Sequence, residues 1–321
     1  MKIQLWLLFY FFFSVGSLEC ALRWSRYYDL KLLQRYWIEG FQGEEKLGLS
    51  GLTTDGNSLF TVSDVEGISR IFQIHLKADS TASLSSFSNL DGKWLEAYEK
   101  RHSGLGRVDL EGIAYCAETF FLVDERKRKV LAYQEGKISQ IDLPFSSFHA
   151  AKNRMNPFSG VINAGLEAIT CDPNRNLLYV FNERMFRMGY IYSLDSSQIL
   201  HQFDVPSGFR APRMEQEHWV YPDFAGSDFH QGKLYLLVRN DYAVLELDGE
   251  SLEVLRRFSF ERHARESYQV PEIFGMAEGL SIFNGRLYLV FDNNEFERVD
   301  MPGAYNPMLL EFEIPQIKKE N

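Results

Sequence analysis

A five-residue phrase recurs along this sequence about every 55 to 60 residues: an apolar residue, Glu, Gly or Ala, a second apolar residue and a small residue. The clear copies are Leu110–Ala114, Leu166–Thr170 and Ala277–Ser281. A weaker copy at Leu49–Thr53 has Ser in place of Glu, and a degenerate copy lies at Phe224–Asp228. A repeat of this period, built from short strands, predicts a radial or stacked array of equivalent modules.

Each copy is followed by a turn and by further strand-like segments. The turns contain Asp-Gly, Asn-Gly or Asp-Pro, which favour hairpins because they supply a positive or preset φ. The second strands are nearly continuously apolar, which indicates burial on both faces: Leu59–Ser63, Phe120–Val123, Leu177–Phe181, Leu234–Val238 and Leu287–Phe291. The third strands alternate more: Arg70–Leu76, Val130–Tyr133, Tyr190–Leu194, Val244–Leu247 and Leu309–Ile314. Fourth strands fit three segments: Ile138–Leu143, Ile199–Val205 and Val254–Phe260.

Four antiparallel strands per repeat, without helical periodicity between them, predict an all-β fold of the β-propeller type. We expect five blades, or six if Tyr27–Phe41 is a divergent copy rather than a strand that closes the ring. A β-sandwich would also explain the alternating strands, but not the recurrence of Glu-Gly at matching points. Residues 22–321 are predicted to form this single domain.

The first 17 residues resemble a secretion signal. Lys2 gives a basic start, Ile3–Phe13 is apolar, and Val15–Ser17 offers small residues for cleavage. Two alternatives remain open: a retained membrane anchor, and a lipoprotein attached through Cys20. Any of these predicts a secreted or periplasmic protein.

The cysteines of the folded part lie near two of the phrases. Cys116 follows Glu111 by five residues and Cys171 follows Glu167 by four. Because side chains alternate along a strand, this difference points the two thiols to opposite sheet faces. We therefore expect two buried thiols rather than a disulfide.

The topology of a propeller predicts where chemistry gathers. First strands line the central channel, and their starts lie on the same face as the ends of second strands. The starts carry Glu111, Glu167 and Glu278, and the ends carry acids and amides, among them Glu125 and Asp292. We expect these groups to form a ring around one mouth of the channel.

Crowded carboxylates need a bound cation, arginine partners or raised pKa values. Oxygen ligands together with Asn amides favour Ca²⁺. The predicted metal ligands are Glu111, Glu167, Glu278, Asp292 and Asn293. Three arginines occupy similar places after second strands, and arginine is a bidentate partner for carboxylate or phosphate: Arg126, Arg184 and Arg239. A structural use of the glutamates, as acceptors of backbone hydrogen bonds or as partners of arginine, remains an alternative.

Several function classes lack their sequence signals. The net charge is −10, whereas a nucleic-acid binder typically carries a basic surface. An acidic protein suits metal ions or cationic partners instead. No Gly-x-Ser-x-Gly elbow, Gly-rich phosphate loop or His-Glu-x-x-His motif occurs.

The same phrases resemble the phytase-like esterase family, named for an esterase-like activity of phytase. Met276–Leu280 and Leu287–Asn294 are similar to its Asn-x-Glu-Gly and Ser-Asp-Asp-Asn ending, and Leu234–Asn240 is similar to the segment before it. Leu110–Arg126 and Leu166–Arg184 fit its repeats.

The resemblance implies Ca²⁺-assisted hydrolysis of a phosphate or carboxylic ester, with Glu278 and Asp292 as catalytic residues and a small anionic ester as substrate. It also implies that the anionic group of the substrate is bound by arginines: Arg126, Arg184 or Arg239. This chain departs from the pattern at Ser50, which replaces a ring Glu, and at Asp228, which lies out of register. A non-catalytic propeller that binds a ligand or protein, and an envelope scaffold, are the alternatives. The sequence predicts no nucleic-acid partner and no membrane contact beyond an N-terminal anchor, and it leaves the oligomeric state open.

Overall fold

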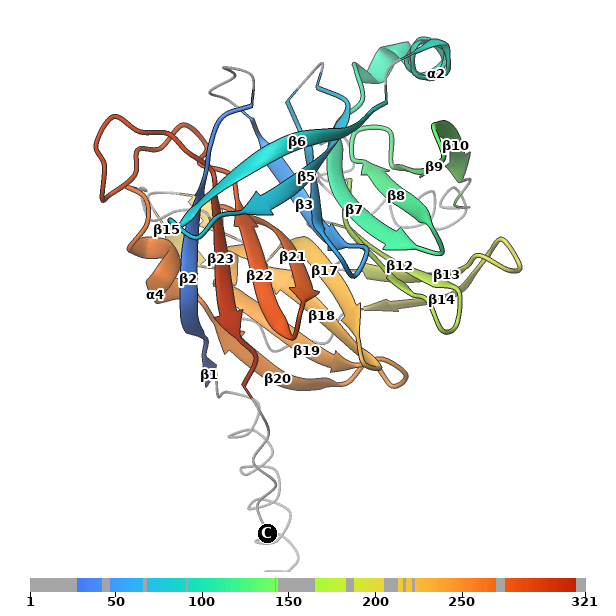
Figure 1. Cartoon of the computed structure of the whole chain (residues 1–321). Helices are drawn as coiled ribbons and strands as arrows, with labels where there is room; N and C mark the ends of the chain where they lie inside the picture. The colour runs from blue at the N-terminus through green and yellow to red at the C-terminus, as the bar shows by residue number, and fades with distance from the viewer. Residues whose placement is uncertain are drawn as a thin grey trace, which may run out of the picture.

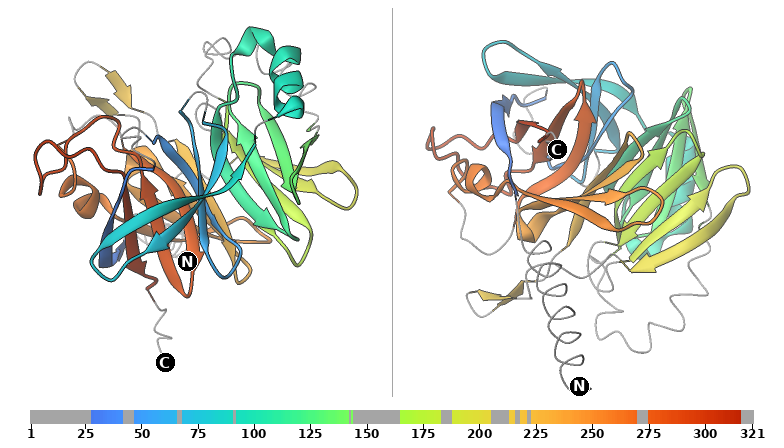
Figure 2. Two further views of the ribbon diagram at one scale, coloured as in Figure 1. Left: turned by 45° about the horizontal axis from the view of Figure 1, so that its top comes forward. Right: turned by 90° about the horizontal axis from the view of Figure 1, so that it is seen from below.

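A computed structural model describes residues 28–41, 47–65, 68–90, 92–141, 143, 165–182, 188–204, 213–215, 218–220, 223–269 and 275–315. Its strands form antiparallel units of four arranged as a β-propeller (Figures 1 and 2). The predicted signal sequence lies outside the described residues. None of the helices within these ranges is long and apolar enough to cross a membrane.

Five four-stranded units are present in the described part of the chain. Unit 1 contains β3 (Leu49–Thr54), β4 (Leu59–Ser63), β5 (Arg70–Leu76) and β6 (Thr81–Asn89). Unit 2 contains β7 (Leu110–Cys116), β8 (Thr119–Asp124), β9 (Lys129–Gln134) and β10 (Lys137–Ile141). Unit 3 contains β11 (Leu166–Asp172), β12 (Leu177–Asn182), β13 (Met188–Ser193) and β14 (Gln198–Asp204).

The last two units complete the ring. Unit 4 contains β17 (Phe224–His230), β18 (Lys233–Val238), β19 (Ala243–Asp248) and β20 (Val254–Ser259). Unit 5 contains β21 (Ala277–Phe283), β22 (Arg286–Phe291), β23 (Met308–Glu313) and, from the other end of the chain, β2 (Lys31–Ile38). Residues 31–38 thus supply one closing strand rather than a further copy of the repeat. The inner strands contact one another in the order β3, β7, β11, β17 and β21, and β21 contacts β3.

Shorter elements lie between or beside the units. The helix α2 (Lys93–Arg101) and the turn η1 (Ser103–Leu105) connect units 1 and 2. The hairpin of β15 (Arg213–Glu215) and β16 (His218–Val220) lies between units 3 and 4 in the sequence. The remaining elements adjoin units 4 and 5: η2 (Arg239–Asp241), α4 (Glu261–Arg265) and β1 (Tyr28–Asp29), which pairs in parallel with β20.

The recurring phrase is a β-bulge. In the inner strands of units 2 to 5 the pairing with the second strand slips by a residue at this point, for example between Leu110 and Gly112 in β7. The same slip occurs in units 3, 4 and 5, whereas in β3 the slip lies between Ser50 and Thr53. A bulge leaves its extra residue unpaired and turns its side chain. The repeat therefore places Glu111, Glu167, Ala225 and Glu278 in one local geometry.

The glycine of the phrase allows adjacent inner strands to approach closely. A Cβ atom on Gly112 would lie 2.3 Å from the carbonyl oxygen of Glu167, and one on Gly279 would lie 2.5 Å from the carbonyl carbon of Gly51. Backbone cannot yield as a flexible side chain can. The repeat of Gly thus reflects packing between neighbouring units.

We expect Gly112→Ala to lower the free energy of unfolding by about 1–3 kcal/mol, because the added methyl group overpacks this contact. Urea unfolding would measure the change. Gly104→Ala is the matched control, since a Cβ there would meet nothing within 4 Å. Equal stability of the two variants would contradict the packing explanation.

Asp228 links the inner strands of units 4 and 5. Its carboxylate lies 3.4 Å from the Ser281 hydroxyl and accepts the backbone N–H groups of Ile282 and Phe229, the latter at 2.8 Å. Burial raises the pKa of Asp228 to about 6, against these hydrogen bonds, which lower it. The residue that departs from the sequence pattern therefore serves the interface between two units.

This pKa predicts a pH dependence. Between about pH 4 and about pH 6 the unfolded chain has lost this proton while the folded protein still holds it, so the unfolding free energy falls as pH rises. Asn does not ionise, so Asp228→Asn lacks this pH-dependent loss of unfolding free energy. We expect the variant to gain up to about 3 kcal/mol relative to wild type between about pH 4 and pH 7. Urea unfolding across this range, with exposed Asp195→Asn as control, would measure it. A pH-independent difference between Asp228→Asn and wild type would contradict the assignment.

The structure corrects the prediction for the two cysteines, because Cys116 and Cys171 form a disulfide with a Cα–Cα distance of 5.9 Å. Their side chains do belong to opposite faces of equivalent sheets. However, opposite faces of neighbouring units meet, and both cysteines belong to the apolar core shared by units 2 and 3. The alternation of side chains holds within one sheet, but it does not prevent a disulfide between the facing sides of two stacked sheets.

Candidate functional site

Two repeated positions carry the polar groups at one end of the units. The first is the second residue of the repeated phrase, which is the bulge residue in units 2 to 5, and the second is the residue that directly follows the second strand. In chain order these residues are Ser50, Asp64, Glu111, Glu125, Glu167, Ala225, Arg239, Glu278 and Asp292. The corresponding Glu183 of unit 3 and the predicted Arg184 lie outside the described residues.

Glu111, Glu167 and Glu278 gather as the repeat predicts. The charge of Glu111 interacts with those of Asp64, Glu125, Asp109 and Glu278. Glu167 and Glu278 both pair with the guanidinium of Arg239. The acidic tips of successive units therefore converge, and they divide into two groups.

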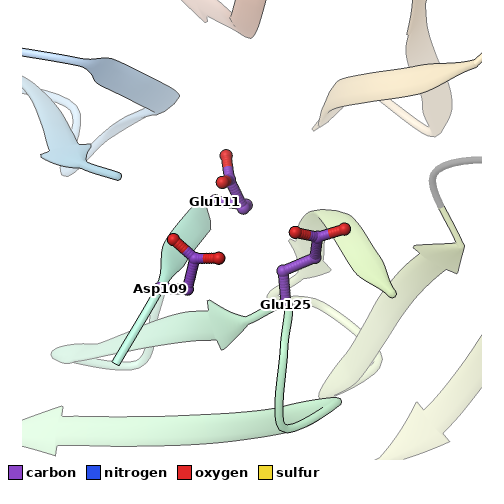
Figure 3. Close-up of side chains that lie close together, drawn as sticks. All are labelled: Asp109, Glu111 and Glu125. Carbon is purple, nitrogen blue, oxygen red and sulfur yellow. The ribbon is translucent and has the colours of Figure 1, made fainter. Parts of the chain in front are cut away.

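The first group contains three carboxylates of unit 2. One oxygen each from Asp109, Glu111 and Glu125 lies within 4.8 Å of the others (Figure 3). Asp109 precedes β7, Glu111 is its bulge residue and Glu125 follows β8. The backbone N–H of Glu125 donates to the carbonyl of Asp109 at 3.0 Å, which fixes the two segments side by side.

Each carboxylate of this cluster also has a partner from the protein. The Ser50 hydroxyl lies 2.8 Å from Glu111 Oε2, and the backbone N–H of Gly165 donates to Glu125 Oε1 at 3.1 Å. Arg126 Nε pairs with Asp109 Oδ2 at 2.7 Å. Ser50, the departure from the ring pattern, thus orients a neighbouring carboxylate.

A buried network supports the turn after β8. The Lys127 ammonium, whose side chain is fully buried, lies 3.3 Å from Asp124 Oδ2 and donates to the carbonyl of Arg107 at 2.6 Å. The Tyr98 hydroxyl of α2 donates to Asp124 at 2.9 Å. These contacts attach α2 to the turn that carries Glu125 and Arg126.

Electrostatics make the first cluster receptive to a cation. Burial raises the pKa of Glu111 well above its ordinary value, and the charges of Asp64, Glu125, Asp109 and Glu278 raise it further. Burial also raises the pKa of Asp109, although Arg126 opposes this effect. Carboxylate oxygens at this spacing fit a hard cation such as Ca²⁺.

The second group surrounds Arg239. Its guanidinium pairs with Asp223 at 2.7 Å, with Glu167 at 3.3 Å, and with Glu278. All four residues are buried. Burial raises the pKa of Glu278; Arg239 opposes this, while Asp292 and Asp223 add to it.

The predicted metal ligands therefore fall in different places. Glu111 belongs to the first group, and Glu167 and Glu278 belong to the second. Asp292 accepts the backbone N–H of Asn294 at 3.1 Å, and the carbonyl of buried Asn293 accepts that of Phe296 at 2.7 Å. Their roles as ligands or catalysts stay predictions, as do those of the arginines.

From the sequence, Glu125 was placed among the acids of the channel mouth but not among the metal ligands, and Asp109 was missed. Glu125 stands directly after a second strand, as Asp292 does, and the repeat therefore predicted its place at the mouth. Asp109 lies three residues before the glycine of the phrase, where unit 4 has Asp223 before Gly226. That match between units was the available signal.

The sequence matches one protein family, and the structure is similar to solved structures of other proteins. A family model described as phytase-like, esterase-like activity of phytase, matches residues 46–222. The structure is similar to glutaminyl cyclase of Myxococcus xanthus, with a TM-score of 0.54, 11% identity, and coverage of 89% of this chain and 98% of that chain. It is also similar to a PQQ-bound aldose sugar dehydrogenase of Streptomyces coelicolor, with a TM-score of 0.47, 12% identity and the same coverage. No match was found among curated proteins.

The likeness to glutaminyl cyclase, at 11% identity, is one of fold alone. The family model, in contrast, covers more than half of the sequence. This protein therefore belongs to the phytase-like family, described by the esterase-like activity of phytase.

Proposed function

We propose that this protein is a secreted, calcium-assisted hydrolase that cleaves a phosphate or carboxylic ester at the acidic channel mouth. The observation that carries the proposal is the cluster of Asp109, Glu111 and Glu125, whose oxygens lie within 4.8 Å of one another. Membership of the phytase-like family supports an ester as substrate. The Cys116–Cys171 disulfide supports export, because disulfides persist in oxidising compartments.

In this proposal Asp109, Glu111 and Glu125 hold the ion, and Ser50 and Arg126 orient two of them. Bound Ca²⁺ would act as a Lewis acid on an ester oxygen. Arg126, whose side chain is 30% exposed, is available to bind the anionic group of the substrate.

In this proposal proton transfer is carried out by Glu278, which belongs to the second group of carboxylates. Burial raises the pKa of Glu278 above its ordinary value, which suits a general acid or base. The charge of Asp292 helps to raise that pKa. These two residues keep the catalytic roles that the family resemblance implies.

A non-catalytic propeller is the second candidate. Two units lack the ring glutamate, with Ser50 and Ala225 at the matching positions of the phrase, and Arg239 neutralises part of the remaining charge. Such a mouth could bind a ligand without transforming it.

Calcium removal separates these candidates. We expect the full chain to hydrolyse a member of a panel of phosphate monoesters and carboxylic esters, and EGTA to lower turnover on the order of 100-fold, since Lewis-acid stabilisation is worth several kcal/mol. Magnesium, with its stricter octahedral geometry, serves as the control ion. Thermal stabilisation by calcium without turnover would favour the binding protein. If calcium gave no stabilisation and no ester were hydrolysed, the acidic ring would be purely structural.

A further inference from the structure

Glu125 and Arg239 occupy the same position in two units of the propeller. Each directly follows the second strand of its unit. The backbone N–H of Glu125 donates to the carbonyl of Asp109 at 3.0 Å, and that of Arg239 donates to the carbonyl of Asp223 at 3.1 Å. Asp109 and Asp223 are thus also structural counterparts.

The surroundings of these counterparts share one composition. In unit 2 three carboxylates gather: Asp109, Glu111 and Glu125. Around Arg239 three carboxylates gather as well: Asp223, Glu167 and Glu278. Because the bulge residue of unit 4 is Ala225, two of these acids come from the neighbouring units 3 and 5. The second set already contains a cation that belongs to the chain.

The chemistry of the guanidinium makes this cation permanent. Arginine is not deprotonated in proteins, so its charge does not depend on pH or on metal supply. Three buried carboxylates without a counterion would strongly destabilise the folded protein. The Arg239 side chain therefore excludes a divalent ion from this point, both because it fills the space and because its positive charge repels the ion.

We infer that Arg239 takes the place of a metal ion in the second carboxylate cluster and restricts the channel mouth to one bound Ca²⁺, at Asp109, Glu111 and Glu125. The restriction to this one ion rests on the proposed function. The replacement of a second ion by Arg239 rests on the contacts of Arg239 alone. Arg239 is then a determinant of metal stoichiometry rather than a group that binds substrate.

The test is the number of Ca²⁺ ions bound by the full chain, measured by isothermal titration calorimetry and by equilibrium dialysis with calcium alone. We expect one ion per chain for the wild type and two for Arg239→Gln. Arg239→Lys, which retains the positive charge, is the matched control and should bind one.

The outcomes separate the two proposals. One ion in both wild type and Arg239→Gln would overturn this inference and leave the proposed site intact. No ion in the wild type and one in Arg239→Gln would support the role of Arg239 and contradict the proposed calcium site. No ion in either protein would overturn both.

Folding of the variant gives an independent readout. Arg239→Gln should melt at a lower temperature than wild type in EGTA, and calcium should raise its melting temperature more than that of wild type. Arg239→Glu, which restores the residue type of Glu125, should respond in the same direction. If neither variant folds at any calcium concentration, the inference is wrong, because the ion then cannot replace the guanidinium.

Discussion

Replacing Glu111 by Gln is expected to lower calcium affinity by more than about 100-fold, since even residues outside the ligand shell of metal sites account for about 10- to 100-fold. Hydrolysis should fall with it. The Gln oxygen can still accept the Ser50 hydrogen bond, so the bulge should keep its shape. Glu111 stands at the centre of the cluster, where the charges of four other acids already raise its pKa.

The stability of this variant distinguishes a ligand from a structural residue. Because the pKa of Glu111 is raised in the folded protein, its ionisation weakens the fold as pH rises above the ordinary value of 4.5. Glu111→Gln removes that penalty, so without calcium it should be at least as stable as wild type near neutral pH. Glu118→Gln, an exposed residue in the turn after β7, serves as control. Wild-type calcium affinity and turnover in Glu111→Gln would contradict the metal assignment.

Removing the disulfide should produce the largest loss of stability. Cys116 and Cys171 close a loop with a sequence separation of 55 residues. For a loop of this length the chain-entropy model gives about 4 kcal/mol of stabilisation. The bond also joins the inner strands that carry Glu111 and Glu167, within the core shared by units 2 and 3.

We therefore expect the double variant Cys116→Ser, Cys171→Ser to lose about 4 kcal/mol in urea unfolding. Wild type treated with a reductant should approach the double variant, and the reductant should leave the double variant unchanged. A loss below about 1 kcal/mol would indicate that the bond adds little to the packing of the two units.

The sequence allowed most of the strands to be predicted because their apolar runs are distinctive. The second strands of all five units lie within a residue of their predicted limits, as in Leu59–Ser63, which is β4. The outer strand β6 was missed because its sequence, Thr81–Asn89, is rich in Ser and lacks an apolar run. The helix α2, which lies between the strands of units 1 and 2, was not predicted.

The candidate site could be predicted in outline but not in detail. The repeat placed Glu111, Glu167 and Glu278 at one opening, and their contacts confirm that they converge. The sequence could not reveal that Arg239 reaches acids of both neighbouring units, because such a contact depends on the packing angle between units. The disulfide was missed for a related reason, since it also joins two neighbouring units.

The most direct test of the proposed site is diffraction from crystals grown with calcium, using the anomalous signal of the ion. We predict one calcium peak per chain, with oxygens of Asp109, Glu111 and Glu125 at about 2.3–2.6 Å. A calcium peak bound by other residues would contradict the proposal. So would crystals grown with saturating calcium that show no peak among these three carboxylates.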